Sequence, residues 1–164
     1  MRTPGLLLTI TVLAAASMPM AAQEKYTGPR PPKPDVPFLY HVDKLIETES
    51  GTATSQETKD ATVYSISGPA ASSARTPMAE PIFLVQAEKL KPDSLALYRM
   101  ETRNGVRTVS IPKKVGKNSP RPIRLSVKQL GGTLYRVEAQ EYCEIGEYCL
   151  SPEGSNQSFC FAVY

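Results

Sequence analysis

The sequence predicts an all-β fold, a single small antiparallel β-sandwich or partly open barrel, preceded by a signal peptide and a proline-rich arm. Several short segments alternate apolar with polar residues, and this period of two is the signal of a half-buried strand. Turn signals separate these segments at spacings typical of sandwiches and barrels. The chain of 164 residues is the length of one domain.

The first 22 residues have the layout of an export signal. Arg2 supplies the positive charge, Leu6 to Ala16 is the apolar run, and the small residues Ala21 and Ala22 follow. This run is shorter than the about 20 residues that a membrane-spanning helix needs. We predict cleavage after Ala22, with cleavage after Ala16 as the alternative. The mature protein is expected to be periplasmic or secreted and to have no transmembrane segment.

A proline-rich linker is predicted over residues 23–37. Five of the ten residues from Gly28 to Pro37 are proline. This density favours an extended tether of the polyproline-II type. The β-domain is therefore expected over residues 38–164.

The first half of the domain contains three predicted strands, at 38–42, 61–66 and 82–85. The last of these is a continuous apolar run, as expected for a strand that is buried on both faces. Residues 47–59 are polar and show no apolar periodicity. We therefore expect a mobile loop there.

A hairpin is predicted around Asn104-Gly105, the pair preferred in a type I′ turn because both residues tolerate positive φ. Its strands are residues 95–103 and 106–111. A two-residue loop places two apolar pairs on one face of the hairpin, Met100 with Val109 and Tyr98 with Ile111.

A second hairpin joins residues 123–130 to 134–139, and here the apolar pattern selects the loop. A two-residue Gly131-Gly132 turn would set Val127 against Arg136. A three-residue loop, Gly131-Gly132-Thr133, sets Val127 against Val137 and Leu125 against Ala139. A one-residue slip turns one strand's side chains to the wrong face, so we predict the three-residue loop with a glycine bulge.

A third hairpin closes the domain, with strands at 147–150 and 159–164. Aromatic and β-branched residues alternate along the second strand, which suits a half-buried sheet. Symmetric pairing sets Leu150 against Phe159, Tyr148 against Phe161, and Cys149 against Cys160. Directly opposed residues are near enough for a disulfide after slight local tightening.

Three cysteines are an odd number for an exported protein, so at least one is unpaired. Cys149 and Cys160 are the disulfide candidates, Cys143 is the candidate unpaired residue, and Cys143–Cys149 is the competing pairing. An unpaired Cys143 would permit a disulfide-linked structural subunit. Three cysteines with His41 could in principle hold zinc, but their spacing does not resemble a zinc motif, and no metal site is expected.

Basic residues are concentrated between positions 99 and 128. This segment contains nine basic residues and only one acidic residue, Glu101. They would form a patch for an anionic partner such as a surface polymer. The alternative is that they are neutralised by the five glutamates between residues 129 and 164. Two features argue against nucleic acid as the partner: the predicted export, and the lack of a basic strand with interspersed aromatic residues. The nine residues are Arg99, Arg103, Arg107, Lys113, Lys114, Lys117, Arg121, Arg124 and Lys128.

No convergent catalytic set is evident. The one histidine, His41, lies in a predicted strand, where a structural role is commoner than catalysis. No Gly-x-Ser-x-Gly motif or phosphate-binding glycine loop is present, so no cofactor is expected. Glu141, Glu144 and Glu147 could supply paired carboxylates for glycoside hydrolysis. A solvated acidic edge is the simpler interpretation.

The ending Gly146-Glu147-Tyr148-x-Leu150, followed by Gly154-Ser155-Asn156-x-x-Phe159-Cys160-Phe161, resembles that of a group of uncharacterised exported bacterial proteins. The segments 79–84 and 121–125 resemble the same group, and the similarity extends over most of the chain after Pro31. The resemblance implies export and a bacterial origin, and it implies no activity.

The sequence therefore favours an exported, non-catalytic binding module of the bacterial envelope, with an envelope protein or an anionic surface polymer as its partner. The alternatives are a small exported hydrolase that uses His41 or the three glutamates, and the disulfide-linked subunit. The sequence does not specify the oligomeric state.

Overall fold

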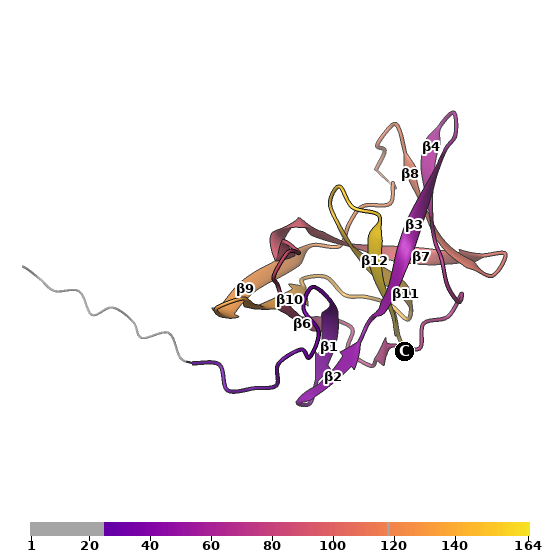
Figure 1. Ribbon diagram of the computed structural model, residues 1–164. Helices are drawn as coiled ribbons and strands as arrows, with labels where there is room; N and C mark the ends of the chain where they lie inside the picture. Colours follow the sequence, from indigo (N-terminus) through magenta and orange to yellow (C-terminus); the bar gives the residue numbers. More distant parts are fainter. Residues whose placement is uncertain (1–24, 118) are drawn as a thin grey trace, which may run out of the picture.

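The computed structural model describes residues 25–117 and 119–164, so the predicted signal peptide, residues 1–22, lies outside the described residues. The described chain is built from β-strands and one short 3₁₀ turn, η1 (Pro92–Ser94) (Figure 1). The strands are β1 (Pro37–His41), β2 (Lys44–Glu47), β3 (Glu49–Glu57), β4 (Ala61–Ile66), β5 (Arg75–Thr76), β6 (Ile82–Gln86), β7 (Leu95–Arg103), β8 (Val106–Pro112), β9 (Leu125–Gly131), β10 (Leu134–Ala139), β11 (Gly146–Pro152) and β12 (Gln157–Val163).

The strands form two sheets, which confirms the predicted all-β, largely antiparallel fold. One sheet has five strands in the order β2-β1-β6-β10-β9. The other runs β11-β7-β8-β4-β3-β12-β5, and β11 also pairs with β12. That extra pairing joins six strands, β11, β7, β8, β4, β3 and β12, into a closed barrel. The short β5 lies outside the ring and runs parallel to β12.

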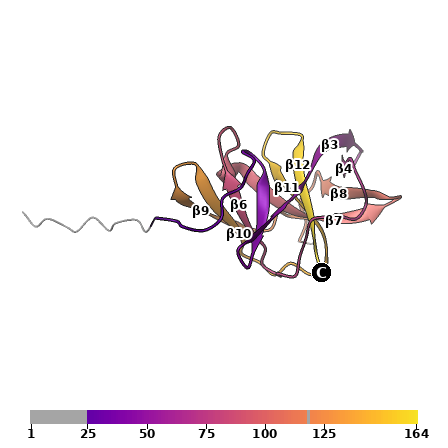
Figure 2. The same ribbon diagram turned by 60° about the horizontal axis from the view of Figure 1, so that its bottom comes forward.

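The main core lies between the five-stranded sheet and the outer face of the barrel. Figure 2 shows the strands of the five-stranded sheet on one side of the molecule and β3, β4, β7 and β8 on the other. The ring of Phe161, on β12, packs edge to face against Phe83 of β6, with the ring centroids 5.1 Å apart. It also stacks on Tyr148 of β11, with a centroid distance of 5.7 Å. Such aromatic pairs contribute beyond the area they bury.

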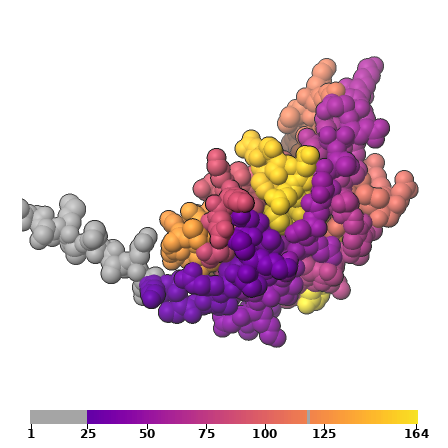
Figure 3. Space-filling model, in the orientation of Figure 1, coloured from indigo at the N-terminus to yellow at the C-terminus, as the bar shows by residue number. Residues whose placement is uncertain are grey.

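The two strands that close the barrel are buried on both faces. Every residue of β12 after Gln157 is buried. In the space-filling view, β12 (yellow) lies between β1 (indigo) and β3 (magenta) (Figure 3). The predicted register of this hairpin is confirmed: Leu150 faces Phe159, Tyr148 faces Phe161 and Cys149 faces Cys160.

The other two hairpins also follow the sequence pattern. Asn104 and Gly105 have φ of 50° and 76°, as a type I′ turn requires, and Arg103 pairs with Val106. In the β9–β10 hairpin, Val127 faces Val137 and Leu125 faces Ala139, as predicted. The register shifts beside the turn, where Gly131 and Gly132 both have positive φ, so the glycine bulge is confirmed.

The pairing of β7 with β8 is shorter than the prediction implied. The recorded pairs end at Glu101–Thr108. Beyond this point β7 pairs with β11 and β8 pairs with β4. Neither predicted apolar pair, Met100 with Val109 or Tyr98 with Ile111, is a cross-strand pair of this hairpin. All four side chains nevertheless line the interior of the barrel.

The mobile loop predicted over residues 47–59 is wrong, because most of it is β3 (Glu49–Glu57). This strand pairs with both β4 and β12. Its inward residues are small, Gly51, Ala53 and Ser55, so they give no apolar signal. A strand that lines a cavity rather than a packed core does not need large apolar side chains on its inner face.

The end of the proline-rich segment is packed on the domain. The carboxylate of Asp35 accepts hydrogen bonds from the backbone N–H groups of residues 88, 89 and 90, at 2.8–2.9 Å. Pro31 is buried, and Lys33 pairs with Glu47 at 2.7 Å. The strand predicted from Phe38 begins at Pro37. Within the described ranges, no helix has the length and apolar character to cross a membrane.

Candidate binding site in the barrel

The barrel encloses an open cavity of about 530 Å³. Because side chains alternate along a strand, every second residue of the six strands points inward. The cavity wall is formed mainly by apolar and aromatic side chains: Tyr64 and Ile66 from β4, Tyr98 and Met100 from β7, and Val109 and Ile111 from β8. Small-molecule sites in proteins are typically hollows of this size with predominantly apolar walls.

Two segments fixed by backbone hydrogen bonds form part of the rim. The N–H of Glu153, in the β11–β12 turn, donates to the carbonyl oxygen of Ser94 in η1, at 2.8 Å. On the other side of the same turn, the N–H of Ala53 donates to the carbonyl oxygen of Asn156 at 2.7 Å. Gly154 supplies the positive φ of 73° within the turn. The mouth is therefore preformed, which lowers the entropic cost of binding.

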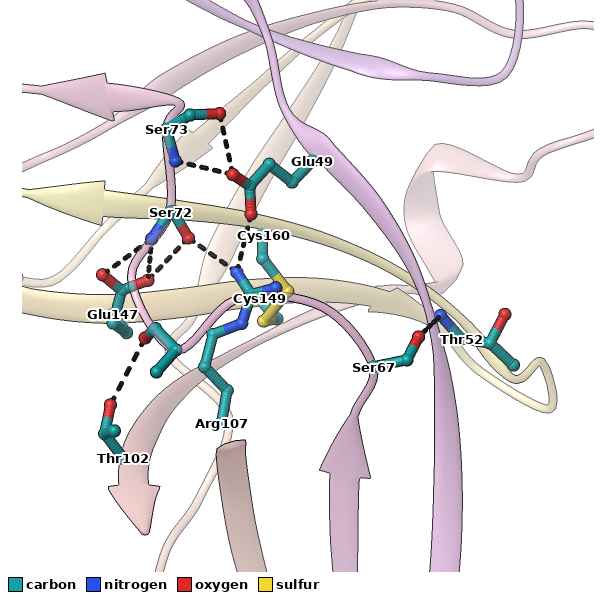
Figure 4. Close-up of polar contacts among 11 residues, drawn as sticks. Glu49, Thr52, Ser67, Ser72, Ser73, Thr102, Arg107, Glu147, Cys149 and Cys160 are labelled. Atoms are coloured by element: carbon teal, nitrogen blue, oxygen red, sulfur yellow. Dashed lines mark hydrogen bonds and ion pairs between the residues drawn. A yellow bond between two sulfur atoms is a disulfide. The ribbon is translucent and has the colours of Figure 1, made fainter. Parts of the chain in front are cut away.

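The opposite end of the barrel is closed by a polar network. Arg107 of β8 is 1% exposed, and its Nη1 donates to a Glu49 oxygen at 3.0 Å and to the Ser72 hydroxyl at 2.7 Å. The Ser72 hydroxyl donates in turn to Glu147 at 2.6 Å. Figure 4 shows these residues, with Ser73, linked in one chain of hydrogen bonds. The pKa of Glu49 is lowered, because its bonds to Ser73 and Arg107 outweigh the effect of burial.

One polar atom in the cavity wall has no partner. The hydroxyl of Ser158, on β12, is fully buried and forms no hydrogen bond within the described residues. Ser158 lines the cavity beside Gly51 and Ile66. A buried hydroxyl without a partner costs free energy relative to one that is paired.

Tyr98 in the cavity wall is affected electrostatically by its surroundings. The pKa of Tyr98 is raised, first by burial and then by the proximity of Tyr64 and Glu153. The phenol of Tyr98 therefore stays neutral over the ordinary pH range. This end of the cavity combines aromatic faces with negative charge.

The predicted disulfide is confirmed and forms part of the barrel wall. Cys149 and Cys160 are bonded, with their Cα atoms 4.0 Å apart. Cys149 lines the cavity together with Ile66 and Met100. Since two of the three cysteines are bonded to each other, the zinc alternative that used all three with His41 is excluded. In the described part of the chain, no cluster of three or more His, Cys, Asp or Glu side chains could hold a metal ion.

Cys143 is unpaired, as predicted, but it is buried, with 1% of its surface exposed. Burial and the nearby carboxylates of Glu141 and Glu80 raise the pKa of its thiol to about 11. A disulfide between two chains would require this thiol to leave the core. The structure therefore disfavours the disulfide-linked subunit.

We expect Cys143 to react with a maleimide at least ~100-fold more slowly in the folded protein than in urea, since the thiolate is the nucleophile. Mass spectrometry of timed samples at pH 7.5 measures this ratio. Equal rates in the two conditions would contradict the burial of Cys143.

The structure does not gather the nine basic residues into one unpaired patch. Arg107 is wrongly assigned to a surface, because it is buried at the closed end of the barrel. Five others pair with carboxylates: Arg99 with Glu144, Arg103 with Glu101, Lys113 with Glu57, and Arg121 and Arg124 with Glu141. Lys114, Lys117 and Lys128 are exposed. The alternative of mutual neutralisation therefore applies to most of the set.

The candidate catalytic residues are not brought together. His41 ends β1 in the five-stranded sheet. Glu141 binds Arg121 and Arg124, and these contacts lower its pKa to about 2. Glu144 pairs with Arg99, and Glu147 accepts hydrogen bonds from Ser72. A carboxylate held ionised by arginines is poorly suited to act as a general acid, so the structure gives the hydrolase alternative no support.

Sequence reasoning did not find the cavity, although it placed Tyr98, Met100, Val109 and Ile111 on one face. An apolar face of this kind does not by itself distinguish a cavity wall from a packed core. A usable signal was the combination of this apolar face on β7 and β8 with small inward residues on another strand of the barrel, β3. Comparisons of the chain with protein-family models, with curated proteins and with solved structures found no match.

Proposed function

We propose that this protein is an exported, non-catalytic binding module of the bacterial envelope, and that it binds a small amphipathic molecule in the barrel cavity. The observation that carries the proposal is the open, apolar cavity with the unpartnered hydroxyl of Ser158 in its wall. Export is supported by the order of charge, apolar run and small residues at the amino end, and the disulfide is compatible with an oxidising compartment.

The cavity is a better candidate site than the basic surface. Most of the surface arginines and lysines in this set form ion pairs, such as Arg103 with Glu101, so their positive charge is already neutralised. The cavity, in contrast, offers apolar contact over its walls and hydrogen-bonding groups at its rim, among them Ser151, Ser155 and Asn156. An apolar body with a polar end fits this distribution.

The test uses N-phenyl-1-naphthylamine, an uncharged probe whose fluorescence rises in apolar surroundings. We expect saturable binding by the folded, disulfide-bonded protein. Ala53→Phe places a large side chain in the cavity and should weaken binding at least ~10-fold. The matched control is Thr54→Phe, because Thr54 is the next residue of β3, exposed on the opposite face.

Thermal unfolding of each variant checks that both remain folded. Absence of saturable probe binding by the unmodified protein would overturn the proposal. The proposal would also be overturned if the two folded variants weakened probe binding equally, or if neither weakened it. In both cases the probe would bind outside the cavity.

A further inference from the structure

The rim of the cavity carries charge of one sign. Within the described residues, the charged side chains that line it are two carboxylates, Asp93 and Glu153. Both are exposed, and neither forms an ion pair with another of the described residues. Their charge is therefore available to a ligand.

Backbone contacts hold the two carboxylates on the same side of the mouth. Asp93 lies within η1, directly before Ser94, and the carbonyl oxygen of Ser94 accepts the hydrogen bond from the N–H of Glu153. The N–H of Ser94 is itself bonded to the carbonyl oxygen of Lys91, at 2.9 Å, which closes the turn. The two acidic residues are thus anchored to one hydrogen-bonded unit rather than to separate loops.

The tyrosines of the wall add a second attraction for positive charge. Tyr64 and Tyr98 line the upper cavity, and Glu153 is near enough to Tyr98 to affect its ionisation. A cation near the face of an aromatic ring is attracted by the negative charge of that face. Farther from the rim along β4 and β7 the wall is apolar, with Ile66 and Met100. The hydroxyl of Ser158, fully buried in the same wall, has no hydrogen-bond partner among the described residues.

We infer that the barrel selects ligands that carry an amine or another cationic group on an apolar chain or ring. The apolar part lies in the cavity, and the cation lies at the rim between Asp93, Glu153 and the two tyrosines. This inference rests on the proposed function and names the class of ligand that the same site accepts.

Three probes that share a ten-carbon chain test the inference: decylammonium, decanol and decanoate. Each is titrated at pH 7 and low salt against protein loaded with N-phenyl-1-naphthylamine. The two charged probes are kept below their micelle concentrations, and decanol is kept below its solubility limit. We expect decylammonium to displace the dye at ~10-fold lower concentration than decanoate, with decanol between them. Raising the salt to 0.5 M should reduce this preference, because charges at the rim are screened.

The double variant Asp93→Asn, Glu153→Gln should reduce the preference to less than ~3-fold. The dye affinity of this variant is measured separately, and each displacement is expressed relative to it. The matched control is Glu80→Gln, Glu88→Gln, which removes the same charge from exposed positions that do not line the cavity. That variant should retain the full preference.

The outcomes separate the two proposals. If the dye and all three chains fail to bind, the proposed function fails. If the dye binds but decanoate displaces it as readily as decylammonium, this inference alone is overturned. A preference that persists in the Asp93, Glu153 double variant would also overturn it, since the rim carboxylates would not be its cause.

Discussion

Replacing Arg107 with alanine is expected to destabilise the protein by about 3–5 kcal/mol. The guanidinium is almost fully buried and bonds to Glu49 and Ser72. Removal of one partner of a buried ion pair leaves the other charge desolvated and uncompensated, and this costs more than the pair contributes. Urea unfolding at pH 7, followed by circular dichroism, measures the change in the free energy of unfolding.

Arg103→Ala is the matched control. Arg103 ends β7, directly before the β7–β8 turn, and forms an ion pair with Glu101. The exposed fractions of these two side chains are 70% and 67%. An exposed pair contributes about 0–1 kcal/mol. The double variant Arg107→Met, Glu49→Gln should recover part of the loss, because the carboxylate that pairs directly with Arg107 is removed as well. If Arg107→Ala were no more costly than Arg103→Ala, the network would not be what closes this end of the barrel.

Loss of the Cys149–Cys160 disulfide is expected to cost about 2–4 kcal/mol. The bond joins residues 11 positions apart, and a cross-link over a loop of this length restricts the unfolded chain by an amount in that range. It also joins β11 to β12, the pairing that completes the barrel. The urea midpoint of the Cys149→Ala, Cys160→Ala variant, compared with the unmodified protein, reports the effect.

Treatment with a reducing agent supplies the control for this second prediction. It should lower the midpoint of the unmodified protein and of Cys143→Ala, and leave the midpoint of the double alanine variant unchanged. A shift in the double variant would place the reducible bond elsewhere. A midpoint that is insensitive to reduction in every case would show that the barrel closes without the bond.

The parts of the fold that could be predicted from the sequence are those set by local chemistry. Asn104-Gly105 fixes a turn and therefore a register, and the alternation around Cys149 and Cys160 fixes the pairing of the last two strands. The turn type and register of each hairpin are determined by a few residues that are close together in the sequence. The glycine bulge was predictable for the same reason, since one register alone kept Val127 and Val137 on the same face.

The barrel itself could not be predicted in this way, because its neighbours are distant in sequence. β12 pairs with β3, and β11 pairs with β7. Such partners are selected by tertiary packing, for which a single sequence carries no periodic signal. β3 was missed because its inward residues are small, and a strand with this composition resembles a loop.

The charge of the chain was misjudged at Arg107 for a related reason. A basic residue in an alternating strand is normally assigned to the solvent face, as Arg103 and Lys128 are. Arg107 occupies the inward position, and Glu49, which neutralises it, lies more than fifty residues earlier. Only the closed barrel brings the two together.

The closing strand also has a consequence for the order of folding. Cys160 pairs in register with Glu49, so this contact joins residues more than a hundred positions apart. Domains dominated by such distant contacts fold slowly, because the entropy of a long loop is lost before the contact forms. The apolar inner faces of β4, β7 and β8 consequently stay exposed until β12 inserts. We expect a chain of this topology to fold through an open barrel, and the rate at which β12 inserts then determines how long these faces remain exposed to self-association.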